Sequence, residues 1–267
     1  MSATTPINLG VTNILATSVR FIWESGTFTP TSLFTNGESG AWYDPSDLST
    51  LFQDSAGTTP VTADGDPVGL MLDKSGNGNH ASQSVSASRP VYRTDGVLHW
   101  LSFDGVDDWM QADGFSWLTT GTAKQISGAG YRNTGGPGYL LHSSGDSVSA
   151  PGIQYAYVMQ TTNNNGFFRF GTDTNVSQSV GLKDIMSSTY DVSLLAASGG
   201  VSGEINSLGV QNVIDGIDTL TIGCRTPSNP SVFWEGDLYG VVISESYIPD
   251  KLPDLNNYLA DKAGVTL

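Results

Sequence analysis

Short segments rich in apolar residues recur along most of this chain, separated by polar and glycine-rich turns. Six of these segments are rich in β-branched and aromatic side chains, which favour pleated strands with one buried face. They cover residues 98–103, 155–160, 166–170, 192–196, 219–224 and 238–244. Many short strands with few helices predict an all-β fold, either a sandwich or a barrel.

Asn-Gly and Asp-Gly pairs punctuate the pattern and predict tight turns, because glycine adopts the positive φ that such turns require. The pairs lie at 36–37, 64–65, 77–78, 95–96, 104–105, 113–114, 165–166 and 215–216. A short helical turn is also expected at residues 45–51. There Ser46 or Asp47 could cap the turn, while Leu48 and Leu51 point inward.

One helix is predicted, over residues 250–263 near the end of the chain. Asp250 is expected to cap it, Pro253 is tolerated in its first turn, and Gly264 follows as a stop. The apolar residues that fall on one face at helical spacing are Leu252, Leu255 and Leu259. This face is expected to pack on the sandwich.

Composition and charge narrow the class of protein. Hydrophobic residues make up 38% of the 267 residues and charged residues only 14%, a balance more typical of external β-proteins than of cytosolic enzymes. The formal net charge of −15 would repel nucleic acid over most of the surface. We therefore expect no nucleic-acid partner.

The single cysteine, Cys224, excludes an intramolecular disulfide and lies in a strand-like segment, where a buried side chain is expected. No stretch approaches the roughly 18 apolar residues of a membrane-spanning helix, so no membrane insertion is expected. The first residues show no apolar run of signal-peptide length. An external composition without an export signal suggests a virion protein, made in a host cytoplasm and exposed on the particle surface.

The first forty residues differ from the rest and leave two interpretations open. They are rich in threonine and turn residues, and they contain the aromatic residues Phe21, Trp23, Phe28 and Phe34. Residues 1–40 could supply outer strands of the same sandwich, or could form an arm that attaches to a neighbouring subunit. The main domain is expected to span residues 41–267.

Several motifs in that domain resemble a known family. They are AWYDPSD at 41–47, DKSGNGNHA at 73–81, RP at 89–90, LSFDGVDD at 101–108, FWEGDLY at 233–239 and YLA at 258–260. Together they resemble the laminin-G-like branch of the concanavalin A-like lectin/glucanase superfamily, including domains of phage structural proteins. The resemblance implies a jelly-roll sandwich with a short C-terminal helix, and it says little about function.

Candidate chemistry is sparse. A glucanase of this superfamily would carry two catalytic carboxylates in a Glu-x-Asp-x-x-Glu-like spacing, and the nearest segment, residues 235–240, lacks the second Glu. We therefore expect no enzyme and predict no catalytic, cofactor-binding or metal-binding residue and no cofactor. The only metal-like cluster, Asp104, Asp107 and Asp108, is more often a turn with solvated charges.

Other residues that could carry chemistry favour structural roles. His80, beside the glycine-rich loop at 73–79, is expected to be hydrogen-bonded, and His99 and His142 have no obvious partners. The aromatic residues that could stack on a sugar ring are Trp109, Trp117, Tyr139 and Trp234. A sandwich of this size needs such residues for its core, so the ligand-binding residues stay unknown.

The leading hypothesis is a non-catalytic phage virion protein, such as a decoration, fibre or tail-associated subunit. Its lectin-like domain would face outward and could mediate adhesion to host-surface glycans, while the arm contacts other virion proteins. A homo-oligomer on the particle is then expected. The alternatives are a stand-alone bacterial carbohydrate-binding or adhesion module and a divergent glycoside hydrolase.

Overall fold

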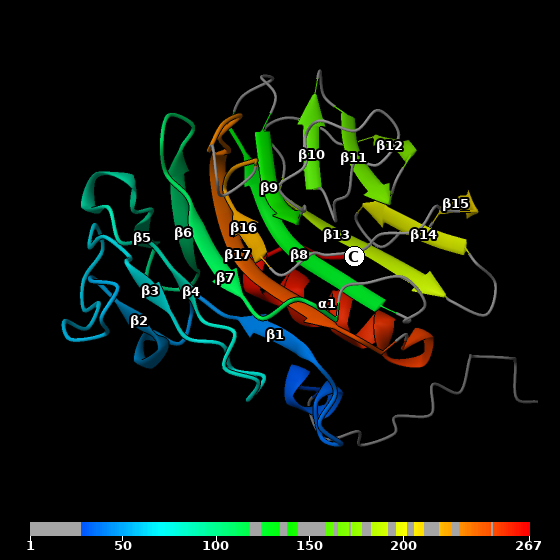
Figure 1. Ribbon diagram of the computed structural model, residues 1–267, viewed down its shortest axis with the longest axis horizontal. Helices are drawn as coiled ribbons and strands as arrows, with labels where there is room; N and C mark the ends of the chain where they lie inside the picture. The colour runs from blue at the N-terminus through cyan, green and yellow to red at the C-terminus, as the bar shows by residue number, and fades with distance from the viewer. Residues whose placement is uncertain are drawn as a thin grey trace, which may run out of the picture.

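Two antiparallel β-sheets lie face to face, and one α-helix covers the outer side of the first (Figure 1). The computed structural model describes residues 28–117, 124–133, 138–143, 219–225, 230–246 and 248–267, together with the backbone of the strands between residues 159 and 210. The prediction of an all-β sandwich with a C-terminal helix is confirmed.

The first sheet, sheet A, has the strand order β15 (Asn206–Val210), β14 (Ala196–Val201), β13 (Lys183–Asp191), β8 (Lys124–Arg132), β17 (Glu235–Ser244), β6 (His99–Asp104) and β5 (Val91–Thr94), with β1 (Gly40–Tyr43) also paired to β17. The second, sheet B, has the order β12 (Thr172–Ser177), β11 (Asn165–Phe170), β10 (Met159–Thr162), β9 (Gly138–Ser143), β16 (Thr219–Ile222), β7 (Met110–Asp113), β4 (Ala81–Ser82), β3 (Leu70–Met71) and β2 (Leu51–Phe52). The helical elements are η1 (Pro30–Leu33), η2 (Leu48–Thr50), η3 (Ser86–Ser88), η4 (Pro249–Lys251) and α1 (Leu252–Ala263).

Strand β17 forms the centre of sheet A and is buried on both faces. A register shift opposite β8, between Leu238 and Gly240, inserts one extra residue and exchanges the two faces of the strand. Leu238 and Val241 consequently both point into the core between the sheets, while Tyr239 packs on the opposite side, against the helix. Burial on both sides explains why this segment is a nearly continuous apolar run and does not alternate.

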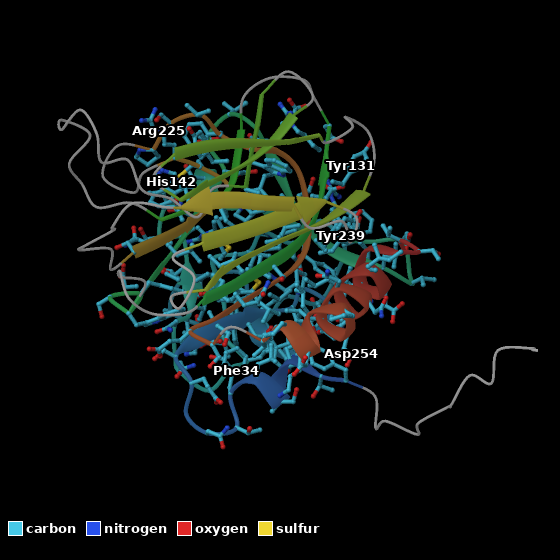
Figure 2. All side chains as sticks on the ribbon, turned by 90° about the vertical axis from the view of Figure 1, so that its right-hand side faces the viewer. Phe34, Tyr131, His142, Arg225, Tyr239 and Asp254 are labelled. Atoms are coloured by element: carbon cyan, nitrogen blue, oxygen red, sulfur yellow. The ribbon has the colours of Figure 1, made fainter. Side chains whose placement is uncertain are left out.

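Helix α1 lies against the outer face of sheet A, where it contacts β8, β13 and β17 (Figure 1). Leu255 and Leu259 are fully buried there, beside Tyr239 and Phe34. Figure 2 shows Phe34 and Tyr239 near this helix, which carries Asp254 in its first turn. Phe28, Leu33 and Phe34 therefore pack on the same helix that packs on sheet A. Of the N-terminal segment 1–40, residues 1–27 lie outside the described residues.

The helix boundaries correct one detail of the sequence analysis. Asp250 does not cap α1, because residues 249–251 form the short helix η4 and Lys251 occupies the N-cap position without a side-chain hydrogen bond. The stop at Gly264 is confirmed by its left-handed conformation, with φ of 68°. The short turn near residue 48 is also confirmed, and Asp47 caps it by accepting a hydrogen bond from Ser49 N.

Most predicted strands and turns are present in the described residues. The segments at 98–103, 166–170, 219–224 and 238–244 correspond to β6, β11, β16 and β17. Of the segments at 155–160 and 192–196, residues 155–158 and 192–195 lie outside the described residues. Positive φ occurs at six of the predicted turn glycines, Gly37, Gly65, Gly78, Gly96, Gly105 and Gly114, whereas Gly166 lies within β11. No helix in the described part of the chain is long and apolar enough to cross a membrane.

Candidate functional site

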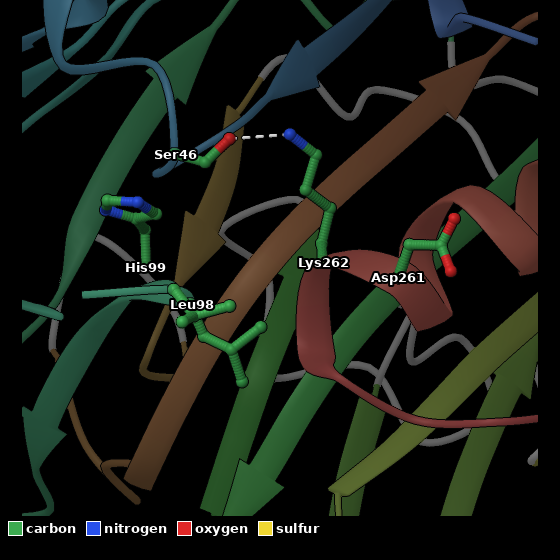
Figure 3. Close-up of a pocket in the computed structure, with 6 residues that line it drawn as sticks. Ser46, Leu98, His99, Asp261 and Lys262 are labelled. Carbon is green, nitrogen blue, oxygen red and sulfur yellow. Dashed lines mark hydrogen bonds between the residues drawn. The ribbon is translucent and has the colours of Figure 1, made fainter. Parts of the chain in front are cut away.

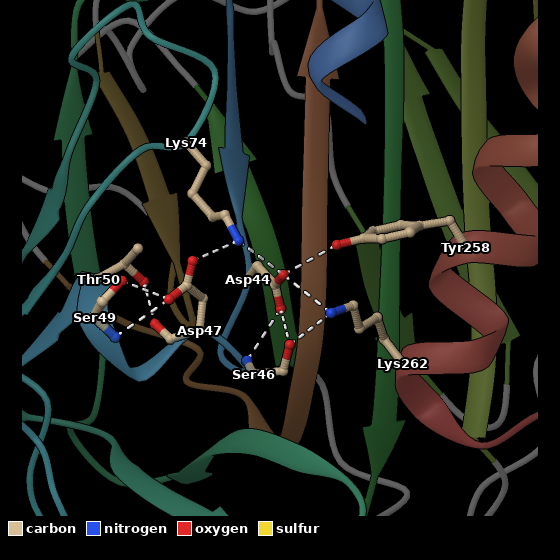
Figure 4. Close-up of polar contacts among 8 residues, drawn as sticks. All are labelled: Asp44, Ser46, Asp47, Ser49, Thr50, Lys74, Tyr258 and Lys262. Carbon is tan, nitrogen blue, oxygen red and sulfur yellow. Dashed lines mark hydrogen bonds and ion pairs between the residues drawn. The ribbon is translucent and has the colours of Figure 1, made fainter. Parts of the chain in front are cut away.

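Asp44 follows directly after β1 and joins three distant parts of the chain. Its side chain is only 4% exposed, and its Oδ2 atom lies 3.2 Å from Lys74 Nζ and 3.1 Å from Lys262 Nζ. Tyr258 donates its hydroxyl to the same oxygen at 3.0 Å, while Ser46 donates to Oδ1 through its backbone N–H and its hydroxyl (Figure 4). We call this set of residues the Asp44 cluster.

The Asp44 carboxylate is ionised in spite of its burial. Burial by itself would raise its pKa, but the hydrogen bond from Ser46 and the charges of Lys262 and Lys74 outweigh that effect and lower the pKa to about 2. The pKa of Tyr258 is raised far above its ordinary value, by burial and by the neighbouring Asp44 charge. Tyr258 therefore keeps its proton and acts as a donor.

The glycine-rich loop at residues 73–79 is organised by its own first aspartate. Asp73 accepts hydrogen bonds from the backbone N–H groups of Trp42, Ser75 and Asn79, at 2.8 to 3.1 Å. His80 Nδ1 accepts from Asp73 N at 3.0 Å, so the structural interpretation of this histidine is confirmed. The motif at 73–81 thus fixes a loop on β1 and supplies Lys74 to the Asp44 cluster.

Next to the Asp44 cluster lies a surface hollow of about 310 Å³ (Figure 3). The turn between β5 and β6 and the last turn of α1 form its two sides. Its lining residues are Ser46, Val97, Leu98, His99, Asp261 and Lys262. The size lies at the lower end of the ~300–1,000 Å³ range of small-molecule pockets. Two aliphatic side chains stand beside four polar ones in its lining.

The polar groups of the hollow are held by the surrounding structure to different degrees. Lys262 Nζ is fixed between Asp44 Oδ2 and Ser46 Oγ, at 3.1 and 2.5 Å. The ring of His99 stacks on Tyr92, whose hydroxyl is hydrogen-bonded to His99 Nδ1, so the expectation that His99 lacks a partner is wrong. The exposed Asp261 carboxylate, at the rim beyond Lys262, has no hydrogen bond or ion pair with any described residue (Figure 3).

A second group of polar side chains follows β6. The carboxylates of Asp104, Asp107 and Asp108 approach within 4.8 Å of one another, an arrangement that could hold a divalent cation such as calcium. Asp108 is buried, and burial together with the nearby charge of Asp104 raises its pKa to about 7. Its Oδ2 atom accepts a hydrogen bond from Asp104 N at 3.0 Å, which ties the turn together.

Two of the four aromatic residues considered as sugar platforms are buried, whereas Trp109 and Trp117 are only partly buried. Trp234 is fully buried in the core between the sheets, and Tyr139 is 7% exposed. Trp117 is half-buried and lies against Phe115, with the two ring centroids 5.9 Å apart. Cys224 is buried too, and burial raises the pKa of its thiol to about 12, so it is no reactive nucleophile.

Sequence reasoning missed the hollow, because its residues come from three segments that have no characteristic spacing. Residue 46 follows β1, residues 97–98 belong to the β5–β6 turn with residue 99 opening β6, and residues 261–262 lie in the last turn of a helix. The one available signal was an acidic residue in the last helical turn, where a carboxylate is unfavourable. His142, for which no partner was expected, lies edge-on to Tyr139 with ring centroids 5.2 Å apart.

Comparisons with known proteins support the fold of this chain, but they do not assign it to a family. No family model and no curated protein sequence matches the chain. Among solved structures, it is similar to Trypanosoma rangeli sialidase in complex with a difluoro-KDN inhibitor, with a TM-score of 0.55, 12% identity and coverage of 88% of this chain and 34% of the sialidase. The same sialidase in complex with sialic acid gives a TM-score of 0.54 and 13% identity over 88% and 35%.

An α-L-arabinofuranosidase soaked with 4-nitrophenyl α-L-arabinofuranoside is also similar, with a TM-score of 0.57, 12% identity and coverage of 88% of this chain and 65% of that enzyme. The chain thus spans about a third of the sialidase and less than two thirds of the arabinofuranosidase. At these identities the likeness shows the fold alone, a β fold that also occurs in proteins acting on carbohydrates. The laminin-G-like resemblance and the phage setting find no match here.

These neighbours contradict the expectation that the chain is not an enzyme. Both are enzymes that act on sugars, and each contains a region with the fold of this chain. The expectation rested on the absence of a Glu-x-Asp-x-x-Glu-like spacing, which is a test for one glycosidase type only. Carboxylates brought together from separate segments of a fold can also form an active site, and a test of local spacing does not detect them.

Proposed function

We propose that this chain binds glycans and that the hollow between the β5–β6 turn and α1 is its binding site. The observation that carries the proposal is the lining itself, in which a hydroxyl, an imidazole, an ammonium and a carboxylate surround an aliphatic wall. Sugar hydroxyls both donate and accept hydrogen bonds, and the C–H faces of the ring pack on apolar side chains.

The rigidity of the site supports the same proposal. Ser46 and Lys262 are held by the buried Asp44, so these two groups are already in place before a ligand arrives. Val97 is 81% exposed at the tip of the β5–β6 turn and gives the hollow an apolar edge. The fold is one that occurs in carbohydrate-acting proteins, which agrees with a sugar as ligand.

A substitution at that edge tests the site. The full chain is screened on a glycan array, and the best ligands are titrated by calorimetry against Val97→Arg and the matched control Val106→Arg. Val106 is 69% exposed on another turn and does not line the hollow, so both changes add the same side chain to an exposed valine. We expect V97R to weaken binding at least roughly tenfold by filling the hollow, with V106R unchanged. Equal affinities of the two variants would refute the site.

Glycoside hydrolysis is a second candidate function, favoured by the acidic residues after β6. A carboxyl group with a pKa near neutrality beside a second carboxyl group is the arrangement of a general acid and its partner, and Asp108 has a pKa of about 7 next to Asp104. The test is release of nitrophenol from a panel of 4-nitrophenyl glycosides by the full chain and by Asp108→Asn. Release that D108N abolishes supports this candidate, and release that D108N leaves unchanged, or none, counts against it.

The setting of the protein is a separate proposal, supported by composition. A charged fraction of 14% and a single cysteine suit an external β-protein assembled without disulfides, and we propose a subunit exposed on a phage particle and attached through the N-terminal segment. Light scattering of the full chain and of a chain beginning at Phe28 tests this. A chain that starts at Phe28 keeps the edge-to-face contact of Phe28 with Tyr258, whose ring centroids lie 6.4 Å apart. A full-length oligomer that becomes monomeric on truncation supports attachment by residues 1–27, and two monomers contradict it.

A further inference from the structure

Among the residues that the structure describes, the charges around the hollow leave one carboxylate without a partner. Lys262 is 3.1 Å from Asp44, and Lys74 lies between Asp44 and Asp47 at 3.2 and 2.8 Å, so the two lysines are matched by two aspartates. Among the lining residues, Asp261 is then the charge that no described residue matches.

The position of Asp261 in its helix makes this carboxylate more unusual. It lies in the last turn of α1, where the backbone carbonyls leave partial negative charge and an acidic side chain is unfavourable. The basic residue of that turn, Lys262, is directed toward Asp44 and Ser46 (Figure 4). Neither the helix nor a neighbouring side chain in the described residues compensates Asp261, and such breaks of local rules concentrate at functional sites.

The turn on the opposite side of the hollow contains a further acidic residue, Asp95, which does not itself line the hollow. Asp95 accepts hydrogen bonds from Val97 N and Leu98 N, at 2.9 and 2.8 Å, and so places its carboxylate in the turn that forms this wall. The formal charge of the whole chain, −15, has the same sign. An acidic sugar such as sialic acid would therefore be repelled, whereas a cationic ligand would be attracted.

We propose that the hollow selects a glycan that carries a free amino group, with the sugar ammonium bound by Asp261 at the rim. The ammonium offers three donors and no acceptor, which matches a carboxylate that has no partner among the described side chains. Ser46 and His99 then face the sugar hydroxyls, and Leu98 contacts the ring. This inference rests on the proposed glycan-binding function and names the class of sugar within it.

A matched pair of ligands tests the selection. The full chain is titrated with the glucosamine trisaccharide and with the N-acetylglucosamine trisaccharide, which differ only in acetylation of the amine, at a pH below the pKa of the sugar amine. Sialyllactose is the acidic ligand, and spermidine supplies the same ammonium chemistry without a sugar. We expect the free amine form to bind at least roughly tenfold more tightly than the acetylated form, as a charge-assisted hydrogen bond implies.

Asp261→Asn tests the residue, and Asp254→Asn is its matched control. Asp254 is exposed in the first turn of the same helix, outside the hollow, so the two variants change the net charge equally. D261N is expected to remove the preference for the amine without weakening the acetylated ligand, and D254N to leave both affinities unchanged.

The outcomes separate this inference from the function on which it rests. If acetylated or acidic sugars bind as tightly as the amine and V97R blocks them, the hollow binds glycans but the selection for an amine is wrong. If spermidine binds as tightly as the trisaccharide, the ligand is an amine and the sugar is not recognised, which overturns the proposal. If no glycan binds to the full chain, both the inference and the glycan-binding function fail.

Discussion

Replacing Asp44 by Asn tests whether a buried carboxylate holds helix α1 on the sandwich. The amide keeps the volume of the side chain and one carbonyl oxygen, but it removes the charge. Lys262 then loses its charged partner within the described residues, whereas Lys74 keeps Asp47 at 2.8 Å. The variant therefore isolates the contribution of one buried charge to the stability of the docked helix.

The magnitude follows from the pKa and from exposure. A lowering of the Asp44 pKa from 3.8 to about 2 corresponds to about 2 kcal/mol of folding free energy at neutral pH. Breaking a fully buried ion pair costs ~3–5 kcal/mol. The side chains of Lys74 and Lys262 remain 19% and 25% exposed, so water replaces part of the lost interaction. We expect D44N to lower the free energy of unfolding by about 2–3 kcal/mol at neutral pH.

The sign of the pH dependence is fixed by the direction of the shift. Because folding lowers the pKa of this acid, its stabilising effect is present above the unfolded pKa of 3.8 and is lost as pH falls from there to about 2. Urea unfolding at neutral and at acid pH measures this, and the difference between wild type and D44N is expected to shrink in acid.

Asp47→Asn is the matched control for this experiment. Asp47 pairs with the same Lys74, but its side chain is 34% exposed, so its loss is expected to cost less than about 1 kcal/mol. A loss for D44N below about 1 kcal/mol at neutral pH, or one no larger than that of D47N, would refute the reasoning about the buried charge.

Three further substitutions probe other features described above. Burial and nearby carboxylates raise the pKa of Asp108 to about 7, so this group stabilises the fold less as pH rises from about 4 to 7. In thermal unfolding we expect D108N to lack this pH dependence and to be more stable than wild type above neutrality, by roughly 2–4 kcal/mol. Parallel stability-versus-pH profiles of the two proteins would contradict the raised pKa. Gly264→Ala places a Cβ atom 2.9 Å from Leu98 at a positive φ, and we expect it to lower the free energy of urea unfolding by about 2 kcal/mol. Gly37→Ala also has a positive φ but meets open space, so its loss should be smaller, and equal losses would contradict the contact with Leu98. Leu259→Ala removes a fully buried side chain and should cost ~2–5 kcal/mol in the same assay, whereas a loss under ~1 kcal/mol would mean that the helix is not packed as described.

Strand positions could be predicted where one face is buried and the other is not, because side chains then alternate. β6 was located within one residue for this reason. β17 begins at Glu235, earlier than the expected residue 238, because Gly236 and Asp237 pair in the ladder although their side chains give no apolar signal. Local pattern alone does not reveal pairing that is stabilised by neighbouring strands.

The helix and the site show a different limit. The leucine pattern located α1, but the preceding η4 moved the cap away from Asp250. Asp44 has the sequence context of a solvated turn residue, and its burial depends on Lys262, a partner 218 residues away. The hollow likewise forms only when separate segments meet, so neither feature could be predicted from local spacing.

This separation of Asp44 and Lys262 along the chain has a consequence for the order of folding events. Closing a loop of this length costs conformational entropy that only a formed sandwich can offset, so the sheets must pair before the helix finds its acidic partner. We therefore expect the Asp44–Lys262 contact to be absent from the folding transition state. Interactions of that kind act mainly by slowing unfolding, and the cluster would extend the lifetime of the native state more than it would speed its formation.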